Sequence, residues 1–308
     1  MLAPHDLPPV FAIWNARWHA PYGRRGAQGV MGWRGLNRVK AWRGGLFGFQ
    51  PNNSTRQFEY PWAFYVAPFS SGLRVLEIGG AMSGFQFALA RAGAVVSNVD
   101  PFRDYGHGPY DAEPSLVHRK LNGYFRTDVT MYPCTLAEAK LASASFDRIF
   151  CISTIEHLEW QEICRTVKEA FRLLREGGLF VLTIDLFLNL VPFTQRERNE
   201  FGVNISVREL IAEAGTDLVY GEKSKLYGFS EFEARDITAN LERYLIGQGY
   251  PSLTQLLVLQ KGRGGDTTVR TNLFSGFVDP TLRTRRERVT SLGAWWLRRL
   301  RDGRRPHP

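Results

Sequence analysis

The chain has 308 residues, a hydrophobic fraction of 44% and a formal net charge of +9. That hydrophobic fraction is ordinary for a soluble globular protein and allows one large domain or two small ones. The N-terminus lacks a basic start followed by an apolar run, which argues against a signal peptide. The most apolar stretch, Leu179–Val191, contains Asp185 and is too short to cross a bilayer. Three cysteines without a Cys-x-x-Cys pair argue against a disulfide framework or a zinc site and favour the cytoplasm.

The positive charge is concentrated at the two ends of the chain. Residues 1–60 carry eight Lys or Arg against two acids, and residues 261–308 carry twelve against four. Such flanks can meet an anionic partner, namely nucleic acid, a phosphorylated substrate or a membrane surface, or they are solvated tails. Residues 291–301 include Trp295-Trp296 and several arginines, which predicts a short basic amphipathic helix. It would contact a membrane peripherally or pack on its own domain.

The first clear elements in chain order form a βαβ unit. Arg74–Ile78 is a short apolar run bounded by glycines, which is typical of a buried parallel strand. The turn Gly79–Gly84 follows, then a predicted helix over Phe85–Ala92 and a predicted strand over Val95–Val99. This spacing favours a right-handed parallel crossover.

Later elements continue the alternation of strands and helices. Residues 101–123 show no clear pattern, although His107 there is a candidate substrate contact. The predicted elements beyond them are a strand at Tyr124–Thr127, a strand at Arg148–Ile152, a helix at Trp160–Arg175, a strand at Leu179–Ile184, a helix from a capping box at Ser206 to Ala214, a strand at Asp217–Tyr220, a helix from a capping box at Ser230 to Ile246, and a strand at Leu253–Gln260. The order predicts an α/β fold with a doubly wound, mostly parallel sheet.

The turn after the first strand is a candidate cofactor site. Its small residues let a ligand approach the backbone, and the following helix points free N–H groups at an anion. Taken alone, Gly79-x-Ala81-x-x-Gly84 is a degraded dinucleotide fingerprint, so an NAD-dependent oxidoreductase is one alternative. Glu77 favours another cofactor: a buried carboxylate needs a partner, and the amino group of S-adenosylmethionine (SAM) supplies one, whereas a pyrophosphate would be repelled. Asp100 ends the next strand, where an acid can accept hydrogen bonds from ribose.

Several motifs in order resemble the class I SAM-dependent methyltransferases. Val75–Ala81 resembles the first motif of that family, an acid followed by a glycine-rich turn. Ser145–Leu158 resembles its fourth-strand motif, and Leu173–Phe180 is similar to its helix, Gly-Gly and fifth-strand motif. The resemblance covers about residues 70–260. It implies SAM as cofactor and a seven-stranded sheet with a C-terminal antiparallel hairpin.

The resemblance also implies roles for single residues and a division of the chain. Asp100 resembles the ribose-binding acid and Asp128, after a short strand, the acid that contacts the adenine amino group. Ala81 and Ser83 stand where the family has glycines. The predicted cofactor-binding residues are Glu77, Gly79, Gly80, Ala81, Ser83, Asp100, Asp128 and Ser153. The predicted parts are a basic and aromatic N-terminal extension, 1–69, a SAM-binding domain, 70–262, and a basic C-terminal extension, 263–308.

The predicted catalytic residues are Glu156 and His157, which lie beyond the carboxyl end of a parallel strand. His157 titrates near neutrality and suits a general base, or else it caps the following helix. The pair resembles a Glu-His pair used near a metal by some small-molecule O-methyltransferases, but no further ligand pattern is visible and no metal is predicted. Asp185 is a candidate for the acceptor pocket. The aromatic run Tyr60–Tyr65 forms either core or a substrate wall.

The sequence thus predicts a SAM-dependent methyltransferase acting on a hydroxyl of a small molecule or glycan. An Asn/Asp-Pro-Pro-Tyr motif, which would favour an amino acceptor, is missing after the fourth strand. An RNA methyltransferase that uses the basic flanks is the main alternative, without a recognisable RNA-binding module. A nonenzymatic scaffold that kept the fold is the other.

Overall fold

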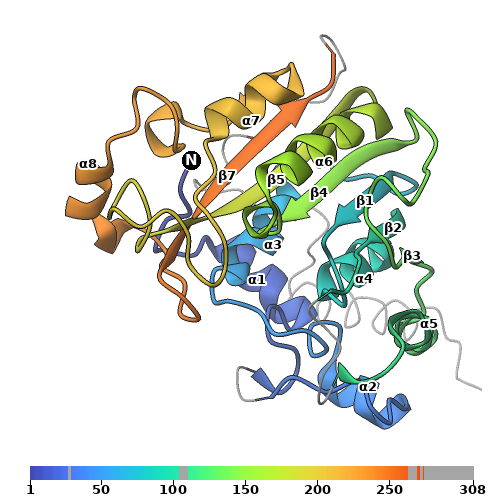
Figure 1. Cartoon of the computed structure of the whole chain (residues 1–308). Coiled ribbons are helices and arrows are strands. Elements are labelled where there is room, and N and C mark those ends of the chain that lie inside the picture. The colour runs from blue at the N-terminus through green and yellow to red at the C-terminus, as the bar shows by residue number, and fades with distance from the viewer. Residues whose placement is uncertain (27–28, 104–109, 263–268, 271–272, 274–308) are drawn as a thin grey trace, which may run out of the picture. The chain divides into compact units, whose positions relative to one another are not determined.

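A seven-stranded sheet forms the centre of the compact unit Met1–Leu273 in the computed structural model, which describes residues 1–26, 29–103, 110–262, 269–270 and 273 (Figure 1). The strands are β1 Arg74–Ile78, β2 Val95–Val99, β3 Thr130–Tyr132, β4 Phe146–Ile152, β5 Leu174–Phe187, β6 Asp217–Tyr220 and β7 Ser252–Gln260. Their order across the sheet is β3-β2-β1-β4-β5-β7-β6. Neighbours from β3 to β5 pair in parallel, and β7 runs antiparallel to β5 and β6. The predicted doubly wound sheet with a late antiparallel pair is confirmed.

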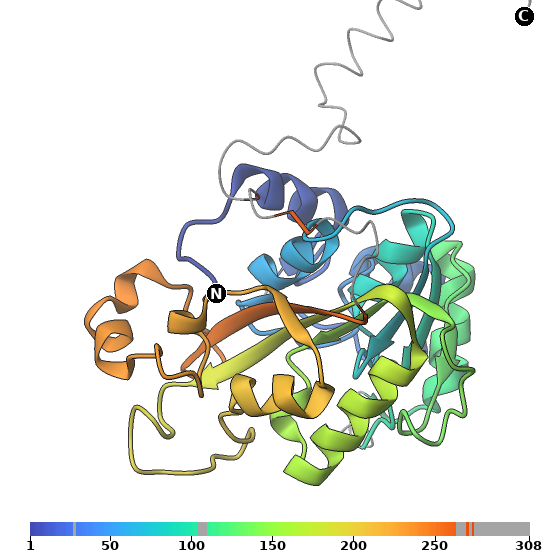
Figure 2. The same cartoon turned by 90° about the horizontal axis from the view of Figure 1, so that it is seen from above.

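Helices cover both faces of this sheet, as the view from above shows (Figure 2). One face carries α1 Pro9–Trp18, α3 Arg56–Tyr65 and α4 Gly84–Arg91, and the other carries α6 Trp160–Leu173 and α7 Val207–Ala214. The remaining α-helices are α2 Arg38–Gly44, α5 Pro114–Phe125 and α8 Ala234–Ala239. This layering follows from the strands, because β5 and β7 are buried along nearly their whole length and need cover on both sides.

Two helices show how local sequence determines the elements. In α6 the buried residues Ile163, Val167 and Ala170 recur at helical spacing and face the sheet. Ser206 caps α7 by accepting the backbone N–H of Glu209, and Gly215 ends it in the left-handed conformation. The capping box predicted at Ser206 is therefore present.

Three predictions of local structure are wrong. Residues 114–125 form α5, whose first turn Glu113 caps from outside the helix, so Tyr124–Thr127 is not a strand. The predicted long helix from Ser230 is replaced by the short α8, and Ser230 instead donates its hydroxyl to Glu231. Gly177 and Gly178 lie within β5 rather than between a helix and a strand, because the strand starts early with an irregular register.

The first 69 residues belong to the same compact unit as the sheet. Leu2 forms an antiparallel bridge with Gln255 of β7, and the N-terminal amino group donates to the carbonyl of Leu256. The aromatic run of α3 is mostly core, since Tyr60, Trp62 and Tyr65 are buried. In the part of the chain that the structure describes, no helix has both the length and the apolar character needed to span a bilayer. The segment 291–301, nearly all of 263–308, and His107 lie outside the described residues.

Candidate functional site

The turn between β1 and α4 is packed tightly against the end of β4. Gly79 has φ +71°, and a Cβ there would lie 2.1 Å from Cγ2 of Thr154. At Gly80 a Cβ would lie 2.6 Å from Cδ of Glu77. Glycine is therefore required at both positions by the protein's own atoms, in addition to any ligand.

Glu77 is a buried carboxylate without a cation beside it. Its side chain is 2% exposed. Oε1 accepts the hydroxyl of Ser83 at 2.7 Å, whereas Oε2 has no hydrogen-bond partner among the described residues. Burial raises the pKa of Glu77 to about 7; the charge of Asp100 adds to this shift, and hydrogen bonds from Ser83 and from the backbone of Gln86 oppose it. A ligand that carries an amino group would supply the missing partner.

Asp100 connects the end of β2 to the same turn. Its Oδ2 accepts the backbone N–H of Ala81 at 2.9 Å, and its Oδ1 accepts that of Phe102 at 2.7 Å. Ala81 has φ +38°, a conformation that glycine adopts more easily, and the bond to Asp100 holds it there. The side chain of Asn98 also donates to the carbonyl of Ala81, at 2.9 Å. The turn is thus fixed by β2 even though it lacks two of the family's glycines.

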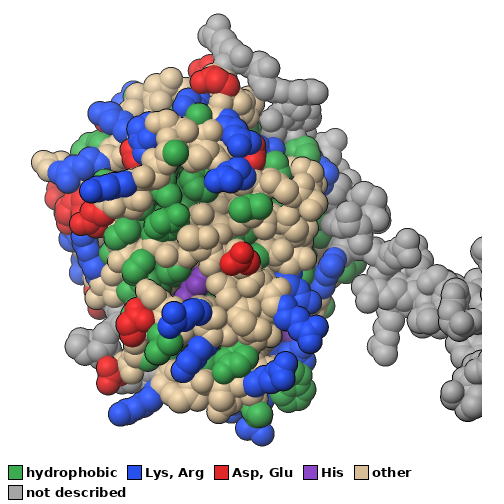
Figure 3. Space-filling model, turned by 90° about the vertical axis from the view of Figure 1, so that its right-hand side faces the viewer, with side chains coloured by type: hydrophobic (Ala, Val, Ile, Leu, Met, Phe, Trp, Pro, Cys, Tyr) green, Lys and Arg blue, Asp and Glu red, His purple; other side chains and the backbone are tan. Residues whose placement is uncertain are grey.

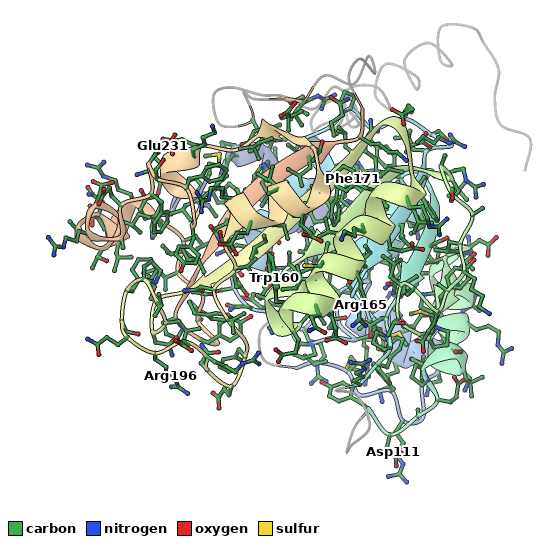
Figure 4. The ribbon with its side chains drawn as sticks, turned by 45° about the horizontal axis from the view of Figure 1, so that its top comes forward. Asp111, Trp160, Arg165, Phe171, Arg196 and Glu231 are labelled. Carbon is green, nitrogen blue, oxygen red and sulfur yellow. The ribbon has the colours of Figure 1, made fainter. Side chains whose placement is uncertain are left out.

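A cavity of about 150 Å³ lies at the carboxyl ends of β1 to β4. Gly79, Pro101, Leu136 and Thr154, which follow these four strands in turn, all line it. Arg165 of α6, labelled in Figure 4, lines it from the other side. Parallel sheets bind nucleotide cofactors at this edge. The glycine turn therefore has an apolar cavity next to it and the carboxylate of Glu77 packed against it.

The prediction that Asp128 follows a strand is wrong. Because α5 extends to Phe125 and β3 begins only at Thr130, Asp128 precedes the strand, at its amino end, and is exposed. The residues that follow β3 and line the cavity are Thr135, Leu136 and Ala137. Because α5 was not predicted, Asp128 was matched to a position several residues too early in the chain.

A second polar group, the Arg56–Glu59 network, is buried between α3 and the sheet. Nη1 of Arg56 lies 2.7 Å from both carboxylate oxygens of Glu59. Glu59 also accepts the hydroxyls of Ser153, Thr183 and Thr254, at 2.9, 2.7 and 3.1 Å. Burial acts to raise the pKa of Glu59, but the guanidinium and the hydroxyls hold it below its ordinary value. Ser153, predicted to bind cofactor, is thus a member of this network.

The carboxyl pair Glu156–Asp185 adjoins that network. The backbone N–H of Asp185 donates to Oε1 of Glu156 at 3.1 Å, while Oε2 of Glu156 has no partner among the described residues. Tyr250 donates its hydroxyl to Asp185 at 2.8 Å. Burial raises the pKa of Asp185 to about 6, although Arg56 opposes the shift. Burial and the charge of Asp185 raise the pKa of Glu156 well above its ordinary value.

His157 is directed away from its neighbour Glu156. It is exposed, and its Nδ1 contacts the carbonyl oxygen of Phe201, so that nitrogen carries the hydrogen. Glu156, in contrast, is fully buried beside Asp185. The two residues predicted together as catalytic therefore lie in different environments.

Sequence reasoning missed Arg56, Glu59 and Tyr250. Arg56 and Glu59 are three residues apart in a run that is otherwise mostly aromatic. A charged pair at helical spacing in such a run could have indicated a buried ion pair. Tyr250 had no local signal, because only the fold brings it to Asp185. In the described residues no group of three or more His, Cys, Asp or Glu is arranged to hold a metal ion.

Comparisons with known proteins bear on the identity of the fold. Residues 76–182 match the family model of a methyltransferase domain. No curated protein matches the chain in sequence. A SAM-dependent methyltransferase from Mesorhizobium loti is 16% identical with a TM-score of 0.47, covering 66% of this chain and 97% of that one. One from Methanosarcina mazei is 15% identical with a TM-score of 0.45, covering 63% and 94%. The [4+2]-cyclase SpnF is 12% identical with a TM-score of 0.47, covering 83% and 94%.

The matched segment runs from β1 through the glycine turn and β4 into β5. It therefore contains Glu77, Asp100 and Glu156. Glu77 in particular suits an amino group and not a pyrophosphate, which disfavours the NAD-dependent alternative. The chain therefore contains, over residues 76–182, a segment that matches a methyltransferase domain.

Proposed function

We propose that this methyltransferase acts on a hydroxyl group of a small molecule or glycan. The observation that carries the proposal is the buried carboxyl pair Glu156–Asp185, beyond the carboxyl ends of β4 and beside the end of β5. Reacting groups lie at this edge in sheets of this kind. A hydroxyl is a weak nucleophile that benefits from a base, whereas an amine is already nucleophilic when neutral.

The cofactor would be held by the turn and the cavity described above. Glu77 would pair with the amino group of SAM, and the backbone of Gly79, Gly80 and Ala81 with Ser83 would form the wall beside it. Asp100, which follows β2 and binds the backbone of the same turn, would accept hydrogen bonds from the ribose hydroxyls. The cavity between Leu136 and Thr154 would take the adenine. SAM supplies an electrophilic methyl group on a sulfonium.

The base would be the Glu156–Asp185 pair acting as one unit. Burial raises the pKa of both carboxyls, and the charge of Asp185 also raises that of Glu156, because ionising both places two like charges in a buried site. The pair would therefore hold a shared proton. When both carboxyls are ionised, Glu156 would accept the proton of the acceptor hydroxyl while the oxygen of that hydroxyl attacks the methyl carbon. The Arg56–Glu59 network would position the pair and moderate its charge, since Arg56 acts electrostatically on Asp185 and on Glu156. His157 is the second candidate base.

The test combines a panel of acceptors with matched variants. Release of S-adenosylhomocysteine is measured with sugars, phenols, amines and RNA as acceptors. We expect Glu156→Gln and Asp185→Asn to lower kcat by about 10²- to 10⁴-fold while leaving the Kd for SAM unchanged. For the wild type we expect kcat to rise with pH through the upper pKa of the pair, and this rise should be absent in Glu156→Gln.

Two results would overturn the proposal. Activity confined to amines would contradict a hydroxyl acceptor, and activity confined to RNA would contradict a small molecule or glycan as the substrate. A larger loss in His157→Ala than in Glu156→Gln would assign the base to His157 instead.

A further inference from the structure

A basic hollow, here called the arginine hollow, lies on the N-terminal helices away from the glycine turn. It has a volume of about 340 Å³, within the range of small-molecule sites. An adjoining hollow of about 490 Å³ shares His19, Arg24 and Trp42 with it. Arg91 of α4 lines it at the end opposite to Gly84, about 10 Å along the helix at a rise of about 1.5 Å per residue. It is therefore separate from the cavity at the strand ends.

Four arginines from separate segments converge on this hollow. Arg17 lies in the last turn of α1, Arg24 follows that helix, Arg38 begins α2 and Arg91 ends α4. No carboxylate is among the described residues that line either hollow, and none of the ion pairs between described residues involves these four arginines. On the face drawn in Figure 3, Lys and Arg side chains are spread from top to bottom and are more common than those of Asp and Glu. Such a concentration of guanidinium groups without counter-charge favours an anion with several oxygens.

Two indole rings accompany the arginines. The side chain of Trp42 is 65% exposed, which is unusual for so large an apolar group. The guanidinium of Arg24 lies 5.5 Å from the centre of the Trp42 ring, and that of Arg17 lies 5.0 Å from the centre of the Trp18 ring. Stacking surface and positive charge therefore occur together, the combination by which proteins hold a nucleobase and its phosphates.

We propose that the arginine hollow binds a nucleoside diphosphate or the nucleoside diphosphate part of a larger ligand. The guanidinium groups of Arg24 and Arg38 would bind the phosphate oxygens, and the exposed ring of Trp42 would stack on the base. The compact hollow suits a ligand of this size better than a nucleic acid strand, which follows a groove and needs charges spaced along it.

The experiment measures binding directly, without methyl transfer. Uridine diphosphate is titrated into the full chain by calorimetry and tryptophan fluorescence, with saturating S-adenosylhomocysteine to occupy the cofactor site. Pyrophosphate and a single-stranded oligonucleotide are titrated in parallel. We expect the nucleotide to bind more tightly than pyrophosphate and to quench tryptophan fluorescence.

Variants separate the two parts of the site. Arg24→Gln and Arg38→Gln should each weaken binding of both phosphates by about ten-fold, because each removes a charged hydrogen bond. Trp42→Ala should weaken binding of uridine diphosphate and leave pyrophosphate nearly unchanged. The matched control Arg208→Gln removes an exposed arginine from α7 and should change neither.

The outcomes are distinct. Equal affinities for pyrophosphate and uridine diphosphate would overturn the nucleoside part of the proposal. Tight binding of the oligonucleotide alone, no binding of any phosphate, or an equal effect of Arg208→Gln would overturn the site itself. These binding measurements do not depend on methyl transfer, so they test the arginine hollow separately from the proposed function and from the Glu156→Gln variant.

Discussion

Two buried acids illustrate two ways in which this fold holds a carboxylate. Glu77 lies near the end of β1, beside the glycine turn, with hydrogen bonds from the Ser83 hydroxyl and the Gln86 backbone but no cation, and its pKa is raised to about 7. Glu59 lies in the Arg56–Glu59 network with a guanidinium and three hydroxyls, and its pKa is lowered. The first acid is left short of partners and suits a ligand, whereas the second is satisfied by the protein and is structural. The predictions below test this contrast.

The largest effect is expected at Glu59. Replacing it by Ala in Glu59→Ala removes the hydrogen-bonded ion-pair partner of the buried Arg56, which we expect to lower the free energy of unfolding by about 3–5 kcal/mol. Urea unfolding measures the change. The matched control is Glu213→Ala, which breaks the exposed ion pair with Lys168 and should leave stability almost unchanged. Similar losses of stability in both variants would show that the buried Arg56–Glu59 network contributes no more than an exposed ion pair.

Glu77 should make stability depend on pH in the opposite sense to a paired acid. Its pKa is about 7 in the folded protein against an ordinary 4.5, so the folded state binds the proton more tightly. Stability is then lost as pH rises from about 4.5 to about 7, by about 3 kcal/mol from this group. Urea unfolding at several pH values should show a smaller loss in Glu77→Gln. Parallel curves for the two proteins would contradict the raised pKa.

The same acid should couple SAM binding to pH. An amino group beside Glu77 favours its ionised form, so the Kd for SAM should fall as pH rises from 6 to 8. In Glu77→Gln we expect weaker binding with little pH dependence, and S-adenosylhomocysteine should behave like SAM because it carries the same amino group. Calorimetry across this pH range provides the measurement. An unchanged Kd in the variant would show that the amino group of SAM does not pair with Glu77.

Gly79 tests how tightly the turn is closed on β4. In Gly79→Ala the new Cβ would overlap Thr154, in addition to the cost of a left-handed alanine. Gly72→Ala is the matched control, since Gly72 has φ +86° and a Cβ there would meet nothing within 4 Å. We expect Gly79→Ala to lower stability by about 2 kcal/mol more than the control. Equal losses in thermal unfolding would mean that the contact with Thr154 is easily relieved.

The two acids also differ in how well the sequence predicted their surroundings. Glu77 was predictable because its turn, strand and helix are consecutive in the chain. The Arg56–Glu59 network joins α3 to β5 and β7, and its hydroxyl partners are ordinary Ser and Thr with no local pattern. Asp128 was misplaced for a related reason: the helix over 114–125 begins after a Pro/Gly-rich stretch that hides its periodicity. Apolar strands and adjacent motifs could be predicted, whereas contacts across the sheet could not.

The smallest effect is expected at two capping-box sequences, of which only one caps a helix in the structure. Ser206 accepts the backbone N–H of Glu209 and starts α7, but Ser230 starts no helix and instead bonds to Glu231. We therefore expect Ser206→Ala to lower stability by about 1 kcal/mol. Ser230→Ala should have almost no effect, because no helix N–H depends on it. Thermal unfolding of both variants compares them directly, and equal losses would mean that the residues after Ser230 are capped in solution as their sequence predicts.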